Sequence, residues 1–149
     1  MAKPGKFSIY DFEKKGVVSI WLATVPLSRI PNAYLEEHYG NDEEPFNQFA
    51  EDFGFGFYDH DSVDTNASKG RAKPVEDLVG KCSFSTSYVE QAVAEAKKRG
   101  LDKTQFVFLM YDIQYAPNRT KVSKSTYMEF LGSFCYDSKA PSAIPYSPE

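Results

Sequence analysis

The stretch that decides the fold class is "GVVSIWLATVP", Gly16 to Pro26. Its β-branched and aromatic residues predict a β-strand over residues 17–23, with Trp21 near its end. Pro26 marks the stop, because proline has no backbone N–H to give to a neighbouring strand. An apolar strand of this kind needs partners, and we expect the rest of the chain to supply them.

Three other stretches predict further strands. "TQFVFLMYD" at 104–112 shows no polar alternation, which is typical of a strand covered on both faces. "STYMEFLGSFCYD" at 125–137 alternates more visibly and predicts a strand with one apolar face. "FGFY" at 55–58 predicts a short strand that runs into a polar loop over residues 62–73. The apolar face of the 125–137 strand would consist of Met128, Phe130, Phe134 and Tyr136.

Helical patterns lie between these stretches. Ser87 and Glu90 have the spacing of a capping box, in which two side chains bond to free backbone N–H groups at a helix start. The helix would run to about Arg99, before Gly100. The spacing of apolar residues predicts two more helices, over 31–40 and 41–54. This order of elements predicts an α+β fold, with a single sheet of about four strands and helices packed on it.

Length and composition fit one domain. A chain of 149 residues, 42% apolar and 26% charged, can bury a core without a disulfide or a metal. We expect residues 1–136 to form a single α+β domain, with residues 1–16 as a possible N-terminal extension. Residues 137–149 are rich in proline and serine and predict a disordered tail.

Charge and hydropathy argue against several classes of protein. The net charge of −4 is unlike a nucleic-acid-binding protein, which should carry a basic face. No segment approaches the roughly 20 apolar residues of a membrane span, and the N-terminus lacks the apolar run of a signal peptide. We therefore expect a cytoplasmic protein with no membrane partner, in which Cys82 and Cys135 stay reduced.

The stretch "FGFGFYDHDSVD", Phe53 to Asp64, raises the question of function, because aromatic residues lead directly into an acidic cluster. Such a cluster could bind a metal, perform acid–base chemistry or present negative charge to a basic partner. On a strand, Asp59 and Asp61 would point to one face and His60 to the other, so the three would not readily share one ion. A purely structural role in turns is a further alternative.

Other acidic residues support the recognition hypothesis. Glu36 and Glu37 fall on the exposed side of their predicted helix, and Asp42, Glu43 and Glu44 follow within one loop. If these groups share a face with the cluster, they would speed the encounter with a basic partner. The candidate binding residues are Tyr58, Asp59, His60, Asp61, Asp64, Glu36, Glu37, Asp42 and Glu43.

Catalytic motifs are lacking. The chain has no glycine-rich phosphate loop, GxSxG elbow, CxxC pair or HExxH motif. Its two histidines are His38 and His60, and nothing beside the cysteines suggests an activated nucleophile. We therefore expect no catalytic residue, no metal and no cofactor. The runner-up to a protein-binding role is a small metal-dependent enzyme built on the acidic cluster, and a third hypothesis is a structural or regulatory interaction module.

Four stretches together resemble the bacterial immunity protein 22 family: "VVSIWLATVP", "FNQFAEDFGFGFYDHD", "SYVEQAVAEAKKRG" and "QFVFLMYDIQY". The most specific pieces are Ser-Ile-Trp around Trp21 and the passage from Phe-Gly to Tyr-Asp-His-Asp through Asp61. The similarity covers residues 17–115 and extends towards Tyr136. Two features depart from the family pattern: Ala23 replaces an expected glycine, and the N-terminal segment precedes the similar region.

The resemblance implies an antidote. Such proteins are encoded beside polymorphic toxins and would protect the producing cell by binding the toxin domain, with no enzymatic activity. A toxin that acts on nucleic acid usually has a basic, concave site, which an acidic inhibitor can mask. Asp59, Asp61 and Asp64, with Tyr58 as an aromatic anchor, would then contact the cognate toxin.

Overall fold

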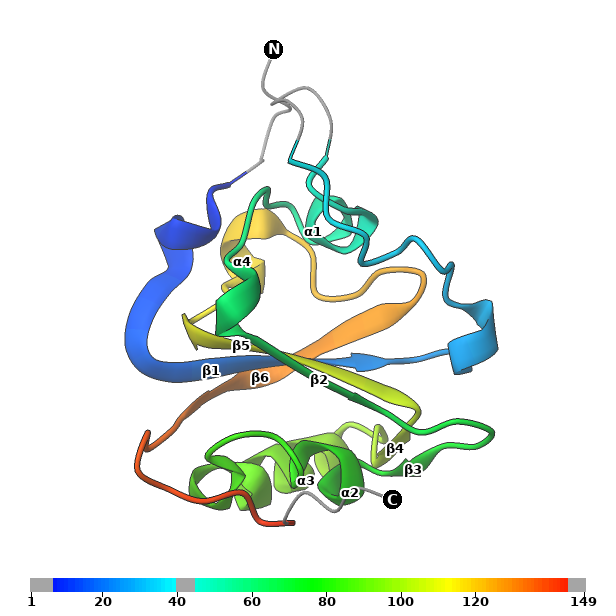
Figure 1. Cartoon of the computed structure of the whole chain (residues 1–149), viewed down its shortest axis with the longest axis vertical. Helices are drawn as coiled ribbons and strands as arrows, with labels where there is room; N and C mark the ends of the chain where they lie inside the picture. The colour runs from blue at the N-terminus through cyan, green and yellow to red at the C-terminus, as the bar shows by residue number, and fades with distance from the viewer. Residues whose placement is uncertain (1–6, 40–44, 145–149) are drawn as a thin grey trace.

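The computed structural model describes residues 7–39 and 45–144. At its centre are the strands β1 (Glu13–Ala23), β2 (Val63–Ala67), β5 (Phe106–Ile113) and β6 (Met128–Cys135). They form an antiparallel sheet in the order β2-β5-β1-β6, with helices packed on it (Figure 1). The predicted α+β fold is confirmed.

Helices cover both faces of this sheet (Figure 1). On one face lie α1 (Gln48–Asp52) and α4 (Pro117–Thr120), and on the other lie α2 (Val75–Val79) and α3 (Val89–Lys98). Two short strands, β3 (Lys73–Pro74) and β4 (Lys103–Thr104), pair in a small separate sheet. The remaining elements are the 3-10 helices η1 (Ile9–Phe12), η2 (Leu27–Arg29), η3 (His60–Ser62) and η4 (Ser85–Ser87).

The side chains of β1 divide between two apolar layers. Val18, Ile20 and Leu22 pack with α2 and α3, whereas Trp21 faces the layer that contains α1. The β5 side chains alternate between the same two layers, so the prediction of a strand covered on both faces is confirmed.

Trp21 is the centre of the layer on the α1 side. Its side chain is fully buried, and its ring centroid lies 5.2 Å from that of Phe130 and 5.3 Å from those of Phe49 and Tyr115. Trp21 meets Phe49, Phe53 and Phe108 edge to face, an arrangement favoured by the charge distribution of aromatic rings. The other rings around Trp21 belong to Phe53, Phe55 and Phe108.

The helix predicted over 31–40 is absent from its described part, residues 31–39, whereas the helix predicted over 41–54 is confirmed in part by α1. Residues 32–35 form turns, because Tyr34 donates its N–H to Pro31 and Glu36 donates to Ala33, each three residues back. α1 is shorter than predicted and begins at Gln48. The side chain of Asn47 caps it, accepting the N–H of Ala50 at 2.8 Å. Residues 40–44 lie outside the described residues.

The prediction of a polar loop over 62–73 was wrong for the first part of this segment, which forms the edge strand β2. Its five residues pair with β5, from Val63 opposite Met110 to Ala67 opposite Phe106. The strand predicted over 55–58 is absent from the described chain except for an isolated bridge between Phe55 and Phe7.

Two local predictions fail for identifiable reasons. Ser87 does not cap α3: its hydroxyl donates to the carbonyl of Phe84 at 2.7 Å, and the helix begins at Val89 without a side-chain cap. The apolar face predicted for β6 is split by a register shift at Gly132, whose φ is +157°. Consequently Met128 and Phe130 face the Trp21 layer, whereas Phe134 and Tyr136 pack on the α2–α3 layer.

Both ends of the described chain add to the domain. Ile9 and Phe12 are buried in the Trp21 layer, although they fall in the possible N-terminal extension. At the other end, where composition predicts disorder, Pro141 accepts the N–H of Thr86 and Ile144 donates to Gly80. Residues 137–144 therefore lie against the segment that joins α2 to α3, and residues 145–149 lie outside the described residues.

Trp21→Ala should lower the free energy of unfolding by about 3–5 kcal/mol, because it leaves a large cavity among rings that cannot close it. Urea denaturation followed by circular dichroism measures the change. Tyr10→Ala is the control, since that aromatic side chain is 54% exposed and should change stability by about 0.5 kcal/mol or less. Equal losses in the two variants would contradict the central role of Trp21.

Candidate functional site

An acidic surface with exposed rings forms where residues 37–39 meet residues 57–61. Nδ1 of His60 lies 2.9 Å from Oε2 of Glu37, and the Tyr39 hydroxyl donates to Oε1 of Glu37 at 2.5 Å. The Tyr39 ring lies 6.3 Å from that of Phe57. We call this surface the acidic ledge; its members are Glu37, Tyr39, Phe57, Asp59, His60 and Asp61.

The ledge is supported by buried rings. Phe46 lies 5.1 Å from Phe57 and 5.2 Å from Tyr39, centroid to centroid, and 4.9 Å from Tyr58. Tyr58 is 1% exposed, and its hydroxyl accepts a hydrogen bond from the Asn47 amide at 2.7 Å. Burial raises the pKa of Tyr58 to about 12. Tyr58 thus lies beneath the ledge, and its ring is not open to a partner in this conformation.

The short turn η3 fixes the carboxylates of the ledge. Asp59 caps η3, and its Oδ1 accepts the N–H of Asp61 at 2.9 Å. Val63 closes the turn by donating its N–H to the carbonyl of His60. The side chains of Asp59, His60 and Asp61 are all exposed, so this turn presents two carboxylates to solvent beside the Glu37–His60 pair.

The aromatic part of the ledge is unusually exposed. Tyr39 is 68% exposed and Phe57 is 48% exposed, although both are large apolar residues. Single exposed rings are common, but adjacent exposed rings are typical of the centre of a contact site, and the carboxylates beside them fit its polar rim. The sequence pattern pointed to Tyr58, whereas the side chains that reach the surface are its neighbour Phe57 and Tyr39.

The remaining predicted site residues separate into three groups. Glu36 is exposed and adjoins the ledge in the chain. Asp42 and Glu43 lie outside the described residues. Asp64 lies on β2, where its Oδ2 accepts the N–H of Ser83 at 2.9 Å, so it faces the α2–α3 side of the sheet and is not part of the ledge.

Residues 18–137 match the family model described as Immunity protein 22. The chain belongs to this family. No match was found among curated proteins or among solved structures. Membership indicates an immunity function and implies that the partner is a protein toxin. The matched region contains η3 and residues 57–61 of the ledge.

The described residues give no support to a metal-dependent enzyme. No group of three or more His, Cys, Asp or Glu side chains within them is placed to hold a metal ion. None of the helices in the described ranges is long and apolar enough to cross a membrane.

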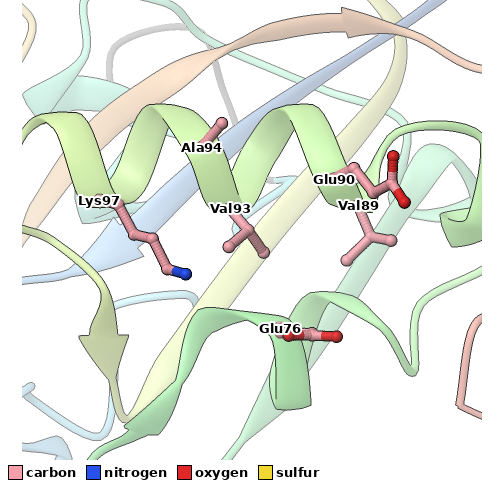
Figure 2. A pocket seen from close by; sticks show the side chains of 6 residues that line it. All are labelled: Glu76, Val89, Glu90, Val93, Ala94 and Lys97. Carbon is pink, nitrogen blue, oxygen red and sulfur yellow. The ribbon is translucent and has the colours of Figure 1, made fainter.

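A groove on the opposite face of the sheet contains none of the predicted residues. It lies between α2 and α3, with a volume of about 290 Å³. In Figure 2, Val89 and Val93 of α3 point towards α2, with Glu76 on the facing helix. Its other lining residues are Glu90, Ala94 and Lys97.

Glu37 should control the protonation of His60. Hydrogen bonding and charge attraction from Glu37 raise the pKa of His60 above its usual value. Because the pKa is raised in the folded state, the pair's contribution to stability is fully present below the unfolded pKa of about 6.5 and is lost as pH rises through the folded value. We expect Glu37→Gln to lower the His60 pKa, as measured by an NMR titration of the imidazole protons. Glu36→Gln is the matched control and should leave that pKa nearly unchanged; equal effects of the two variants would contradict the pairing.

Proposed function

We propose that this protein neutralises its cognate toxin by covering a basic surface of the toxin with the acidic ledge. The observation that carries the proposal is the pair of exposed rings, Tyr39 and Phe57, beside the carboxylates of Glu37, Asp59 and Asp61. Asp42 and Glu43, which follow Tyr39 closely in the chain, belong to the proposed surface on sequence grounds.

The charge of the ledge would act before contact. Complementary charge speeds the encounter of two proteins and fixes their relative orientation, more than it adds affinity. The net charge of −4 acts in the same direction. A toxin whose active site binds nucleic acid presents the complementary basic surface, so the ledge would occupy the place of phosphate groups.

The aromatic rings would supply affinity after contact. Buried aromatic side chains at the centre of an interface commonly account for much of the binding energy. Phe57 and Tyr39 rest on Phe46, so their positions are largely set before binding and little conformational freedom is lost. Inhibition would be stoichiometric, would need no cofactor, and would take place in the cytoplasm.

Reversing the ledge charge tests this proposal. We expect Asp59→Lys/Asp61→Lys to weaken binding to the toxin domain encoded beside this gene by on the order of 2–5 kcal/mol, if these carboxylates form buried ion pairs with the toxin. Titration calorimetry with a catalytically inactive toxin domain measures the affinity. Phe57→Ala should weaken binding without any change in charge.

The control for this experiment reverses a charge on the other face of the sheet. Glu90→Lys alters an exposed carboxylate at the α2–α3 groove and should leave the affinity almost unchanged at moderate salt. A folded double variant that binds as tightly as the unaltered protein would refute the role of Asp59 and Asp61. Failure of the unaltered protein to bind the neighbouring toxin domain would refute the proposed function itself.

A further inference from the structure

A second aromatic surface lies at the same end of the sheet as the ledge, on the α2–α3 side. Its rings are Phe84, Tyr111 and Tyr136, which we call the aromatic cluster. Phe84 and Tyr136 are nearly parallel, with 18° between the ring planes and 5.5 Å between centroids, and Tyr111 meets both edge to face. All three residues are partly exposed. Asp64, which follows η3 by two residues, connects this surface to the ledge.

Phe84 of this cluster, and Asp112 beside it, have left-handed backbone. Three non-glycine residues in the described part of the chain have a positive φ: Phe84 at 63°, Asp112 at 62° and Lys121 at 67°. Phe84 is the most unusual, because left-handed backbone is rare for a bulky residue, whereas aspartate adopts it more readily. Asp112 is linked to the cluster, since its Oδ1 accepts the Tyr136 hydroxyl at 2.7 Å. Strained residues persist where surrounding contacts enforce them, and they concentrate at functional sites.

Two carboxylates border the aromatic cluster, and neither has a cationic partner among the residues that the structure describes. Oδ2 of Asp64 lies 3.2 Å from the Tyr111 hydroxyl and accepts the Ser83 N–H. Oδ1 of Asp112 accepts the Gly16 N–H at 2.9 Å in addition to the Tyr136 hydroxyl. Both side chains are partly buried, yet no lysine or arginine in the described ranges forms an ion pair with either of them. A partly buried carboxylate held only by neutral donors favours the approach of a cation.

We propose that the aromatic cluster, with Asp64 and Asp112, binds an arginine side chain of the toxin. Guanidinium is planar and weakly hydrated, so it can lie against an aromatic face and bind a carboxylate at the same time. The compact, strongly hydrated ammonium group of lysine suits this combination less well. The inference rests on the proposed function and extends the toxin-binding surface from the ledge around the end of the sheet. In this proposal Asp64 contacts the toxin, as the sequence predicted, although it is not part of the ledge.

A purely structural explanation makes a different prediction. If the cluster only closes the end of the α2–α3 core, changing Phe84 should alter stability and leave toxin affinity intact. Phe84→Asn distinguishes the two, because asparagine tolerates the left-handed backbone while the ring is removed. We expect the folded variant to bind the neighbouring toxin domain about 10- to 100-fold more weakly. Lys121→Asn is the matched control, since Lys121 has the same backbone conformation at the end of α4 on the opposite face; its affinity should stay unchanged.

A second measurement does not depend on the toxin. N-acetyl-arginine amide should shift the NMR signals of the Phe84, Tyr111 and Tyr136 rings in a saturable manner, and N-acetyl-lysine amide should shift them several-fold less. Asp64→Asn keeps the shape and the acceptor oxygen of Asp64 but removes its charge, so it should weaken the arginine response several-fold. This variant also serves if Phe84→Asn fails to fold.

The outcomes separate the two proposals. Toxin binding by the unaltered protein that is unaffected by both Phe84→Asn and Asp64→Asn would overturn the arginine site and leave the proposed function standing. If the unaltered protein does not bind the toxin, the proposed function fails, and the arginine titration alone decides whether the site exists. Absence of ring shifts, or equal responses to arginine and lysine, would overturn the site.

Discussion

The packing of Trp21 into a shell of aromatic rings is the interaction on which the rest of the structure depends. Trp21 lies on β1, between β5 and β6, and its ring connects these two strands to the helix α1 through Phe108, Phe130 and Phe49. The contacts continue outward. Phe49 touches Tyr58, Tyr58 touches Phe46, and Phe46 supports the exposed rings of the ledge. Because the rings of the ledge pack on the core, they are held in fixed positions, and less conformational entropy is lost when a partner binds.

The strands at the centre of the sheet could be predicted from the sequence, and the edge strand could not. The strands predicted at 17–23 and 104–112 are buried on both faces. Such strands need continuous apolar sequence, which can be recognised from composition alone. β2 reads "VDTNA" and has the polarity of a loop, since an edge strand buries little. Its position depends on pairing with β5, which lies far away in the sequence. A pattern confined to a short window carries no information about such pairing.

The surface exposure of the candidate site could be predicted in part from the sequence, and the arrangement of its side chains could not. Aromatic residues followed by carboxylates indicated residues 57–61, and the structure exposes Phe57 and residues 59–61 while it buries Tyr58. The sequence could not show whether Phe57 or Tyr58 faces outward. In an extended segment, a shift of one residue exchanges the buried and exposed side chains. The same limit applies to β6, where the shift at Gly132 sends Tyr136 to the α2–α3 side. The aromatic cluster therefore could not be predicted, as Phe84, Tyr111 and Tyr136 come from segments far apart in the chain.

The edges of the sheet indicate how a partner would be recognised. An unpaired edge strand can bind another strand through its backbone, which gives affinity with little selectivity for side chains. In β2, however, the N–H of Val63 is donated to His60, and the N–H of Ala67 is donated to the side chain of Asn66. At the other edge, Phe130 donates its N–H to Ser123. These engaged donors leave fewer free backbone groups for strand addition, which favours recognition of a partner through side chains. Recognition by side chains on turns, as proposed for η3 and the Phe84 segment, would allow specificity to change by substitution while the sheet stays intact.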